Sequence, residues 1–240
     1  MKVYEFGADT APVILLLPGT CCHWKSNFGQ VIPLLQRDFR VLCVSYDGFD
    51  ETESTEFPTM LAETEKIEAY ILKNCGGHIR AAYGCSLGGS FVGLLAARKS
   101  IHMDYGILGS SDLDQCSKLA AKLQTNLLLP LIYPLIRDGQ FKSRFLQKRL
   151  EKCSAEKGDY LRAFMAMFGA ARLYVTMQSC KNQFYSDLIT PLPEGIDVPG
   201  TEIHIFYALK MGAKYRARYQ QHFAHPVIHE LDLQHEELLA

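Results

Sequence analysis

Short apolar runs recur along the chain and predict the strands of a sheet. Val13–Leu17 is wholly apolar and stops at Pro18 and Gly19, which is typical of a strand buried on both faces of a mostly parallel sheet. Similar runs predict further strands at Arg40–Ser45, Ile79–Tyr83, Tyr105–Leu108, Glu202–Leu209 and Val227–Leu233.

Between these strands, apolar residues lie three or four positions apart, which is the spacing of one face of a helix. These positions are Phe28, Val31, Ile32, Leu35 and Phe39 in the first segment, Met60, Thr64, Ile67 and Ile71 in the second, and Met211, Tyr215, Tyr219 and Phe223 in the last. A helix of small residues is predicted over Phe91–Lys99. Strands and helices that alternate in this way predict an α/β fold with a doubly wound, mostly parallel sheet.

The alternation stops after the Tyr105–Leu108 strand. From about residue 113 to residue 199 no clean strand pattern is present. Residues at helical intervals in this region are Tyr160, Phe164, Met167, Ala171 and Tyr174. We therefore expect residues 113–199 to form a helical cap inserted into an α/β core of residues 1–112 and 200–240.

The charge balance narrows the class of partner. The 240 residues contain 25 Lys and Arg against 26 Asp and Glu, which gives a formal net charge of −1. A chain with this balance has no strong field to attract nucleic acid or an anionic membrane, so a small-molecule partner is expected. The most apolar run, Leu127–Ile136, is interrupted by Pro130 and Pro134 and is too short for a membrane span. The sequence gives no indication of an oligomeric state.

The cysteines bear on metal binding and on location. Eight are present, with no C-x-x-C pair and no clusters at metal-ligand spacing, so neither a metal site nor a disulfide framework is expected. Residues 1–7 lack the basic and apolar regions of a secretory signal. A cytoplasmic protein with reduced thiols is therefore expected.

One motif carries chemistry. Gly84-Cys85-Ser86-Leu87-Gly88 matches G-x-S-x-G, a turn in which glycines flank a strained serine whose hydroxyl projects above a sheet. The motif follows a predicted strand and opens a predicted helix, so Ser86 is the predicted nucleophile at the carboxyl edge of the sheet. The helix N-terminus would stabilise an oxyanion, with the Leu87 N–H as one donor. Alternatively, the glycines only allow close packing of the strand and the helix.

A serine nucleophile needs a base, and His235 is the predicted one. Among the eight histidines, it alone follows the carboxyl end of a late strand, on the same edge as Ser86. Six others lie within strands, just before strands at the opposite edge, or beyond the far end of a helix. The alternative for His235 is a solvent-exposed histidine near a chain end.

The acid of a triad is harder to assign, because the loop after the penultimate strand, Tyr207–Gly212, contains no carboxylate. Asp112 directly follows the Tyr105–Leu108 strand and keeps the chain order Ser, Asp, His, so it is the predicted acid. Asp114 is the near alternative. Either aspartate could instead cap the first helix of the cap, and a Ser–His dyad is a further alternative.

The turn at residues 18–24 follows the first central strand and offers a second oxyanion donor. This donor would be the N–H of Thr20 or of Cys21. Cys85, at the x position of the serine motif, is expected to point down into the sheet as a buried, inert thiol.

With these motifs in this order, the chain resembles the α/β-hydrolase superfamily over nearly its whole length. The resemblance is carried by the turns at 18–20 and 46–48, the serine motif at 84–88 and His235. It implies a mostly parallel eight-stranded sheet, a Ser-His-Asp/Glu triad, and hydrolysis of esters, amides or related bonds without a cofactor. The chain departs from the family at Pro18, where many members have histidine before glycine, and in the missing acid after the penultimate strand.

The preferred function is a serine hydrolase that cleaves a carboxylic ester of a small, hydrophobic substrate through an acyl-enzyme on Ser86, as esterases and lipases do. His235 would deprotonate Ser86, and the N–H groups of Leu87 and Thr20 would hold the oxyanion. The apolar content of the cap would select an acyl substrate. The alternatives are a catalytically weak or inactive binding protein of the same fold, and an acyltransferase.

Overall fold

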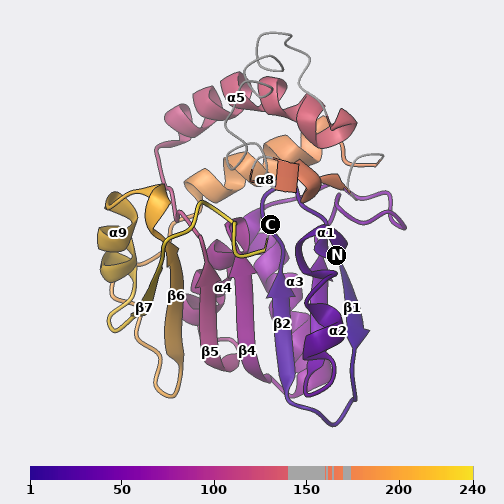
Figure 1. The fold of residues 1–240 in the computed structure, drawn as a ribbon, viewed down its shortest axis with the longest axis vertical. Coiled ribbons are helices and arrows are strands. Elements are labelled where there is room, and N and C mark those ends of the chain that lie inside the picture. Colours follow the sequence, from indigo (N-terminus) through magenta and orange to yellow (C-terminus); the bar gives the residue numbers. More distant parts are fainter. Residues whose placement is uncertain (140–159, 161, 164, 170–173, 240) are drawn as a thin grey trace.

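A computed structural model of the protein describes residues 1–139, 160, 162–163, 165–169 and 174–239. Its described residues form a seven-stranded sheet in the order β1-β3-β2-β4-β5-β6-β7 (Figure 1). The strands are β1 (Lys2–Phe6), β2 (Val13–Leu17), β3 (Arg40–Ser45), β4 (His78–Cys85), β5 (His102–Gly109), β6 (Glu202–Ala208) and β7 (Val227–Leu231). Every neighbouring pair is parallel except β1 with β3. The predicted α/β fold with a mostly parallel sheet is confirmed.

The antiparallel strand β1 was not predicted. Its five residues mix polar and apolar side chains and are mostly half-buried, as suits an edge strand, so they lack the continuous apolar run that marks the central strands. The resemblance implied eight strands, whereas the described residues form seven.

Helices cover both faces of the sheet and the carboxyl ends of its parallel strands. They are α1 (Trp24–Phe28), α2 (Ile32–Leu35), α3 (Met60–Cys75), α4 (Leu87–Arg98), α5 (Lys118–Asp138), α8 (Met177–Ile189) and α9 (Lys214–His222), with a 3-10 turn η2 (Leu209–Met211). In Figure 1, α1 and α2 lie in front of the sheet, α3 and α4 lie behind it, and α5 and α8 lie above the carboxyl ends of the parallel strands.

Two apolar cores follow from the alternation of side chains along the central strands. In β2, Ile14 and Leu16 pack with residues of α1 and α2, whereas Leu15 and Leu17 pack with residues of α3 and α4. Because both faces of a central strand are buried in this way, its sequence reads as an unbroken apolar run.

The helix predicted from the spacing of Phe28 to Phe39 is divided into α1 and α2. Gly29 ends α1 and its N–H donates to the carbonyl of Lys25 at 3.0 Å. Pro33 lies in the first turn of α2, where its missing N–H costs no intrahelical hydrogen bond. The apolar spacing therefore continued across a helix boundary that the glycine and the proline mark.

Helix α5 runs through both of its prolines, contrary to the expectation that they interrupt the apolar run. Pro130 and Pro134 lie inside the helix, where each removes one intrahelical hydrogen bond. Within the described residues, α5 is the one helix whose length and composition would suffice to cross a membrane, and 33% of its most apolar window is buried in protein. This is weak evidence for a span, because a core helix can have the same composition.

The region expected to form a cap lies between β5 and β6. Helices α5 and α8 pack against each other there. Tyr160 is helical and Met167 lies in a turn, while Phe164 and Ala171 lie outside the described residues. Tyr174 lies in a turn before α8, so the helical spacing extended past the end of the helix.

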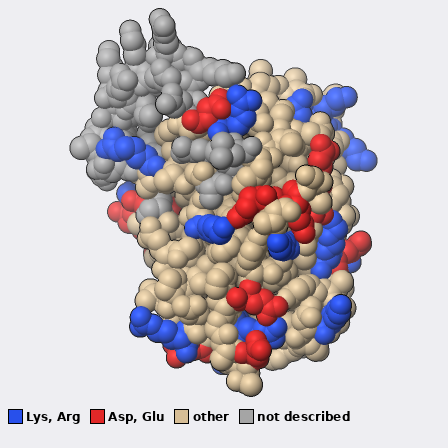
Figure 2. Space-filling model, turned by 90° about the vertical axis from the view of Figure 1, so that its right-hand side faces the viewer, with Lys and Arg blue, Asp and Glu red and all other residues tan. Residues whose placement is uncertain are grey.

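The surface carries both signs of charge. On the face shown in Figure 2, Lys and Arg side chains lie among Asp and Glu side chains, without an extended patch of one sign. This distribution agrees with the formal net charge of −1.

The packing of α4 on the sheet generates a test of the fold. Phe91 is fully buried and its ring stacks on Tyr46 at a centroid distance of 4.8 Å. Phe91→Ala should lower the free energy of unfolding by about 3–5 kcal/mol, because it leaves a cavity in the larger core. Urea denaturation would measure this loss. Leu61→Ala, at a side chain 42% exposed on α3, should change stability by less than about 0.5 kcal/mol, and equal losses in both variants would contradict the packing described.

Candidate active site

The turn between β4 and α4 places Ser86 at the carboxyl edge of the sheet. Ser86 has φ 49° and ψ −112°, a conformation that costs free energy in a residue with a side chain. Two hydrogen bonds hold it there. The Ser86 N–H donates to the carbonyl of Gly109 at 2.8 Å, and the Ser111 hydroxyl donates to the carbonyl of Ser86 at 2.8 Å.

The flanking glycines are required by close backbone approaches. A Cβ atom on Gly84 would lie 2.0 Å from the carbonyl oxygen of Gly88, and a Cβ atom on Gly88 would lie 2.1 Å from that of Leu17. The glycines therefore do allow close packing of strand and helix, and the same packing forces Ser86 into its strained turn.

His235 meets Ser86 across the carboxyl edge. Its Nε2 atom lies 3.2 Å from Ser86 Oγ, and the Tyr160 hydroxyl donates to the carbonyl of His235 at 2.8 Å. Burial lowers the pKa of His235, while the negative charge of Asp112 opposes that effect. A neutral imidazole at this distance can accept the serine proton.

Asp112 and Asp114 lie in different surroundings. Asp112 lines the same cavity as Ser86 and His235, and burial raises its pKa, as does the charge of Asp114. Asp114 instead pairs with Arg218 at 2.6 Å. Of the two candidates, Asp112 is the one whose charge raises the pKa of His235.

Neither aspartate caps the first helix after β5. The N-cap of α5 is Ser117, whose hydroxyl accepts from the N–H of Ala120 at 3.3 Å. Asp112 accepts from the N–H of Asp114 at 3.5 Å, which is a local turn contact two residues along the chain. The capping alternative for these residues is wrong, because α5 begins at Lys118.

The turn after β2 supplies the candidate oxyanion donors. The Cys21 N–H is already engaged, since it donates to Gln183 Oε1 of α8 at 2.7 Å. The Gly19 N–H donates to Asn27 Oδ1 at 2.9 Å. Thr20 lines the cavity between these two anchored residues, so its N–H is the better candidate within this turn. Leu87, the other candidate, is the first residue of α4.

Ser86 opens into a cavity of about 320 Å³ beneath α5 and α8. The polar residues of its lining include Thr20, Ser86, Asp112, His235 and Glu236. The apolar lining consists of Ile132, Leu135, Ile136, Met167, Phe168 and Phe184. A substrate bound here would place a reactive group at Ser86 and an apolar portion toward α5.

Glu236 was not among the site residues predicted from the sequence. It directly follows His235, is 3% exposed, and the Cys85 thiol donates to its Oε2 atom. Burial raises the pKa of Glu236 to about 7. Cys85 itself is fully buried with a raised pKa, as expected of an inert thiol. No sequence signal distinguishes Glu236 from the exposed acids near it.

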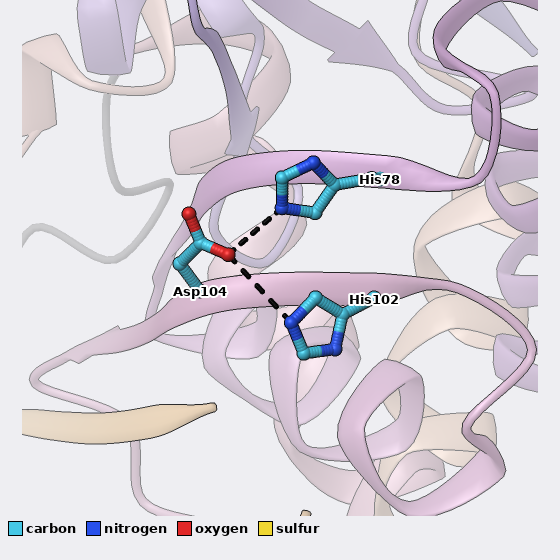
Figure 3. A group of neighbouring side chains, drawn as sticks. All are labelled: His78, His102 and Asp104. Carbon is cyan, nitrogen blue, oxygen red and sulfur yellow. Dashed lines mark hydrogen bonds and ion pairs between the residues drawn. The ribbon is translucent and has the colours of Figure 1, made fainter. Parts of the chain in front are cut away.

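Two groups of side chains within the described residues have the composition of a metal site. In the first, His78 and His102 lie 2.8 and 3.6 Å from the same oxygen of Asp104 (Figure 3). Arg80 pairs with the other oxygen of Asp104 at 2.8 Å, so ion pairing explains the arrangement. The histidines begin β4 and β5, at the edge of the sheet opposite Ser86.

The second group lies nearer the cavity and consists of His23, Asp50 and Glu51. His23 Nε2 is 2.8 Å from Glu51, and Asp50 accepts from the Tyr4 hydroxyl at 2.8 Å. Its hydrogen bonds tie the turn after β2 to the turn after β3.

The geometry agrees with what comparisons with known proteins find. A family model described as the alpha/beta hydrolase family matches residues 14–232. No curated protein matches the chain.

Solved structures share the fold. A protein from Desulfitobacterium hafniense assigned to the alpha/beta hydrolase family has a TM-score of 0.80 at 16% identity, covering 99% of this chain and 94% of its own. A hydrolase from Pseudomonas aeruginosa PA01 has a TM-score of 0.70 at 14% identity, over 98% of this chain and 86% of its own. An enol-lactonase from Burkholderia xenovorans LB400 has a TM-score of 0.68 at 15% identity, over 98% and 89%.

The close approach of Gly88 to β2 generates a prediction. Gly88→Ala should destabilise the protein by about 3 kcal/mol or more, because the new methyl group meets the backbone of Leu17. Gly93→Ala, on the same helix, is the matched control. Its methyl group would meet the flexible end of Leu192 at 3.0 Å and would lie at an ordinary contact distance of 3.6 Å from Phe223, so a change within about 1 kcal/mol is expected in thermal or urea unfolding. Similar stabilities for the two variants would contradict the described turn.

Proposed function

Because the chain belongs to the alpha/beta hydrolase family, we propose that it is a serine hydrolase that cleaves a carboxylic ester of a small, hydrophobic substrate through an acyl-enzyme on Ser86. The observation that carries this proposal is the distance of 3.2 Å between Ser86 Oγ and His235 Nε2 at the mouth of a largely apolar cavity.

In the first half of the reaction, Ser86 Oγ bonds to the acyl carbon while His235 Nε2 takes the hydroxyl proton. The N–H groups of Leu87 and Thr20 donate to the oxygen that becomes negative. When the carbon–oxygen bond of the ester breaks, His235 passes the proton to the departing alkoxide, which leaves as an alcohol. The acyl group stays on Ser86.

In the second half, water replaces the alcohol. His235 takes a proton from water while the water oxygen bonds to the acyl carbon. It then gives the proton to Ser86 Oγ as the carboxylic acid leaves. Asp112 would stabilise the imidazolium that forms in each half, because its charge already favours the protonated form of His235.

The cavity supports a small, mainly apolar substrate. Its volume of about 320 Å³ lies at the low end for small-molecule sites, and its apolar lining comes largely from the region between β5 and β6. We propose that this region, residues 113–199, acts as the cap that selects the acyl group. A lactone is a cyclic carboxylic ester, so the enol-lactonase of the same fold is consistent with this bond type.

Ser86→Ala should abolish hydrolysis of short p-nitrophenyl esters, because no other group would form the acyl-enzyme. Labelling by a fluorophosphonate probe should disappear in the same variant. Ser100→Ala, at an exposed serine just after α4, should retain both activities. Wild-type protein that neither turns over esters nor reacts with the probe would favour a binding protein of this fold.

Asp112→Asn should lower kcat by up to about 10⁴-fold, since the charge that stabilises the imidazolium is lost. The same change should lower the pKa of His235 further, because Asp112 raises it, so the acid limb of the rate profile should move to lower pH. Asp114→Asn should leave kcat within a few-fold, because Asp114 pairs with Arg218. The reverse pattern in pH-dependent kinetics would move the acid to Asp114, and no loss in either variant would favour a dyad.

A further inference from the structure

The residue after the candidate base is held in an unusual way. Glu236 has φ 62°, a left-handed conformation that is uncommon for a residue with a side chain, and it is 3% exposed. A long acidic side chain normally lies in water, so both the backbone and the burial need a compensating interaction.

That interaction joins the two segments that form the catalytic pair. The Cys85 thiol donates to Glu236 Oε2, and the backbone N–H of Ser86 also faces this carboxyl group. Glu236 follows the base His235, and Cys85 precedes the nucleophile Ser86. The contact therefore ties together two segments 151 residues apart, one residue along each segment from the 3.2 Å contact between Ser86 and His235.

Burial and the charge of Asp112 disfavour a negative charge on Glu236, and they outweigh the hydrogen bonds from Cys85 and Ser86, which favour one. The titratable groups that face it from the packed elements are Cys22, Tyr83, Cys85, Asp112 and Tyr160, with His235 as its neighbour in sequence. None of these is a fixed cation, and Glu236 Oε1 has no hydrogen-bond partner among the described residues.

An ionised Glu236 would be buried with hydrogen-bond donors but without a cationic partner among the described residues, and burial penalises the charged form more than the neutral one. Glu236 is therefore mainly the neutral acid below about pH 7. The rise of its pKa to about 7, caused first by burial, has the same direction.

We propose that Glu236 is a positioning residue, whose neutral carboxyl group packs on Cys85 and holds His235 against Ser86, and that a negative charge on this group weakens the hold. The proposal rests on the proposed function of Ser86 and His235. It assigns Glu236 no contact with the reacting atoms.

The pH dependence of the rate follows from this arrangement. The rate should rise with pH as His235 loses its proton, with an apparent pKa below its ordinary value of 6.5, since burial lowers it. It should fall again near pH 7 as Glu236 ionises. A Ser–His pair without such a group would instead reach a plateau on the alkaline side.

The free energy of unfolding should also depend on the ionisation of Glu236. The folded-state pKa of Glu236 is raised above its value in the unfolded chain, about 4.3. Its contribution to stability is therefore fully present below about pH 4.3 and is lost progressively as the pH rises through about 7.

Glu236→Gln tests the proposal, because glutamine keeps the size and the hydrogen-bonding capacity but does not ionise. At pH 6 its kcat should lie within a few-fold of wild type. At pH 8 it should exceed the wild-type kcat by about tenfold, because a group with a pKa of about 7 is roughly one-tenth protonated there. Glu236→Ala, which removes the contact with Cys85, should lower kcat at every pH with little change in KM.

The matched control is Glu237→Gln, at the adjacent acid, whose carboxylate accepts from the Gln234 N–H at 2.5 Å. The rate of this variant should still fall above about pH 7, as in wild type. If the rate of Glu236→Gln also falls above about pH 7, or if this variant loses activity at all pH values as the alanine variant does, the positioning role is overturned.

A measurement without turnover separates this proposal from the proposed function. In wild type, the imidazole NMR signals of His235 should shift a second time near pH 7, and the melting temperature should fall between pH 6 and pH 8. Both changes should be smaller in Glu236→Gln. If wild type shows the second NMR shift and the fall in melting temperature but does not hydrolyse esters, the proposed function is wrong and the link between Glu236 and His235 stands. If both changes are equally large in wild type and in Glu236→Gln, the link is wrong.

Discussion

The geometry of the site depends on how closely the start of α4 packs against β2. At Gly88 the helix backbone comes so near the carbonyl of Leu17 that no side chain fits between them. This approach, together with the one at Gly84, compresses the connection between β4 and α4 and leaves Ser86 in its left-handed conformation. Ser86 lies half-buried at the carboxyl edge of the sheet, and the hydrogen bonds from Ser86 to Gly109 and from Ser111 to Ser86 keep the turn from relaxing.

Burial shifts the pKa values of the ionisable side chains around Ser86. The pKa of His235 is lowered, whereas the pKa values of Asp112 and Glu236 are raised, and desolvation is the first cause in each case. Each group is thereby shifted toward its neutral form. Asp112 and His235 partly offset one another, but no fixed cation faces Glu236 among the described groups around it. Under the proposed function, the chemistry of the site would therefore depend on pH near neutrality.

The region between β5 and β6 contributes to the site in two ways. Its helix α5 supplies part of the apolar lining of the cavity, and its helix α8 supplies Gln183, which anchors the turn after β2 through the Cys21 N–H. Neighbours with the same fold but 14–16% identity share the architecture of the sheet and do not specify what this region selects. Under the proposed function, the choice of substrate would rest on this lining.

The sequence by itself determined the sheet strands that are buried on both faces, the glycine-flanked turn at Ser86 and the position of His235 after the last strand, because these depend on local patterns and on the direction of the chain. Only the tertiary structure decided which aspartate faces His235, since Asp112 and Asp114 are two residues apart and differ only in their neighbours. The same holds for Glu236 and Cys85, which lie 151 residues apart. Burial and charge pairing are properties of the whole fold, so a local pattern cannot reveal them.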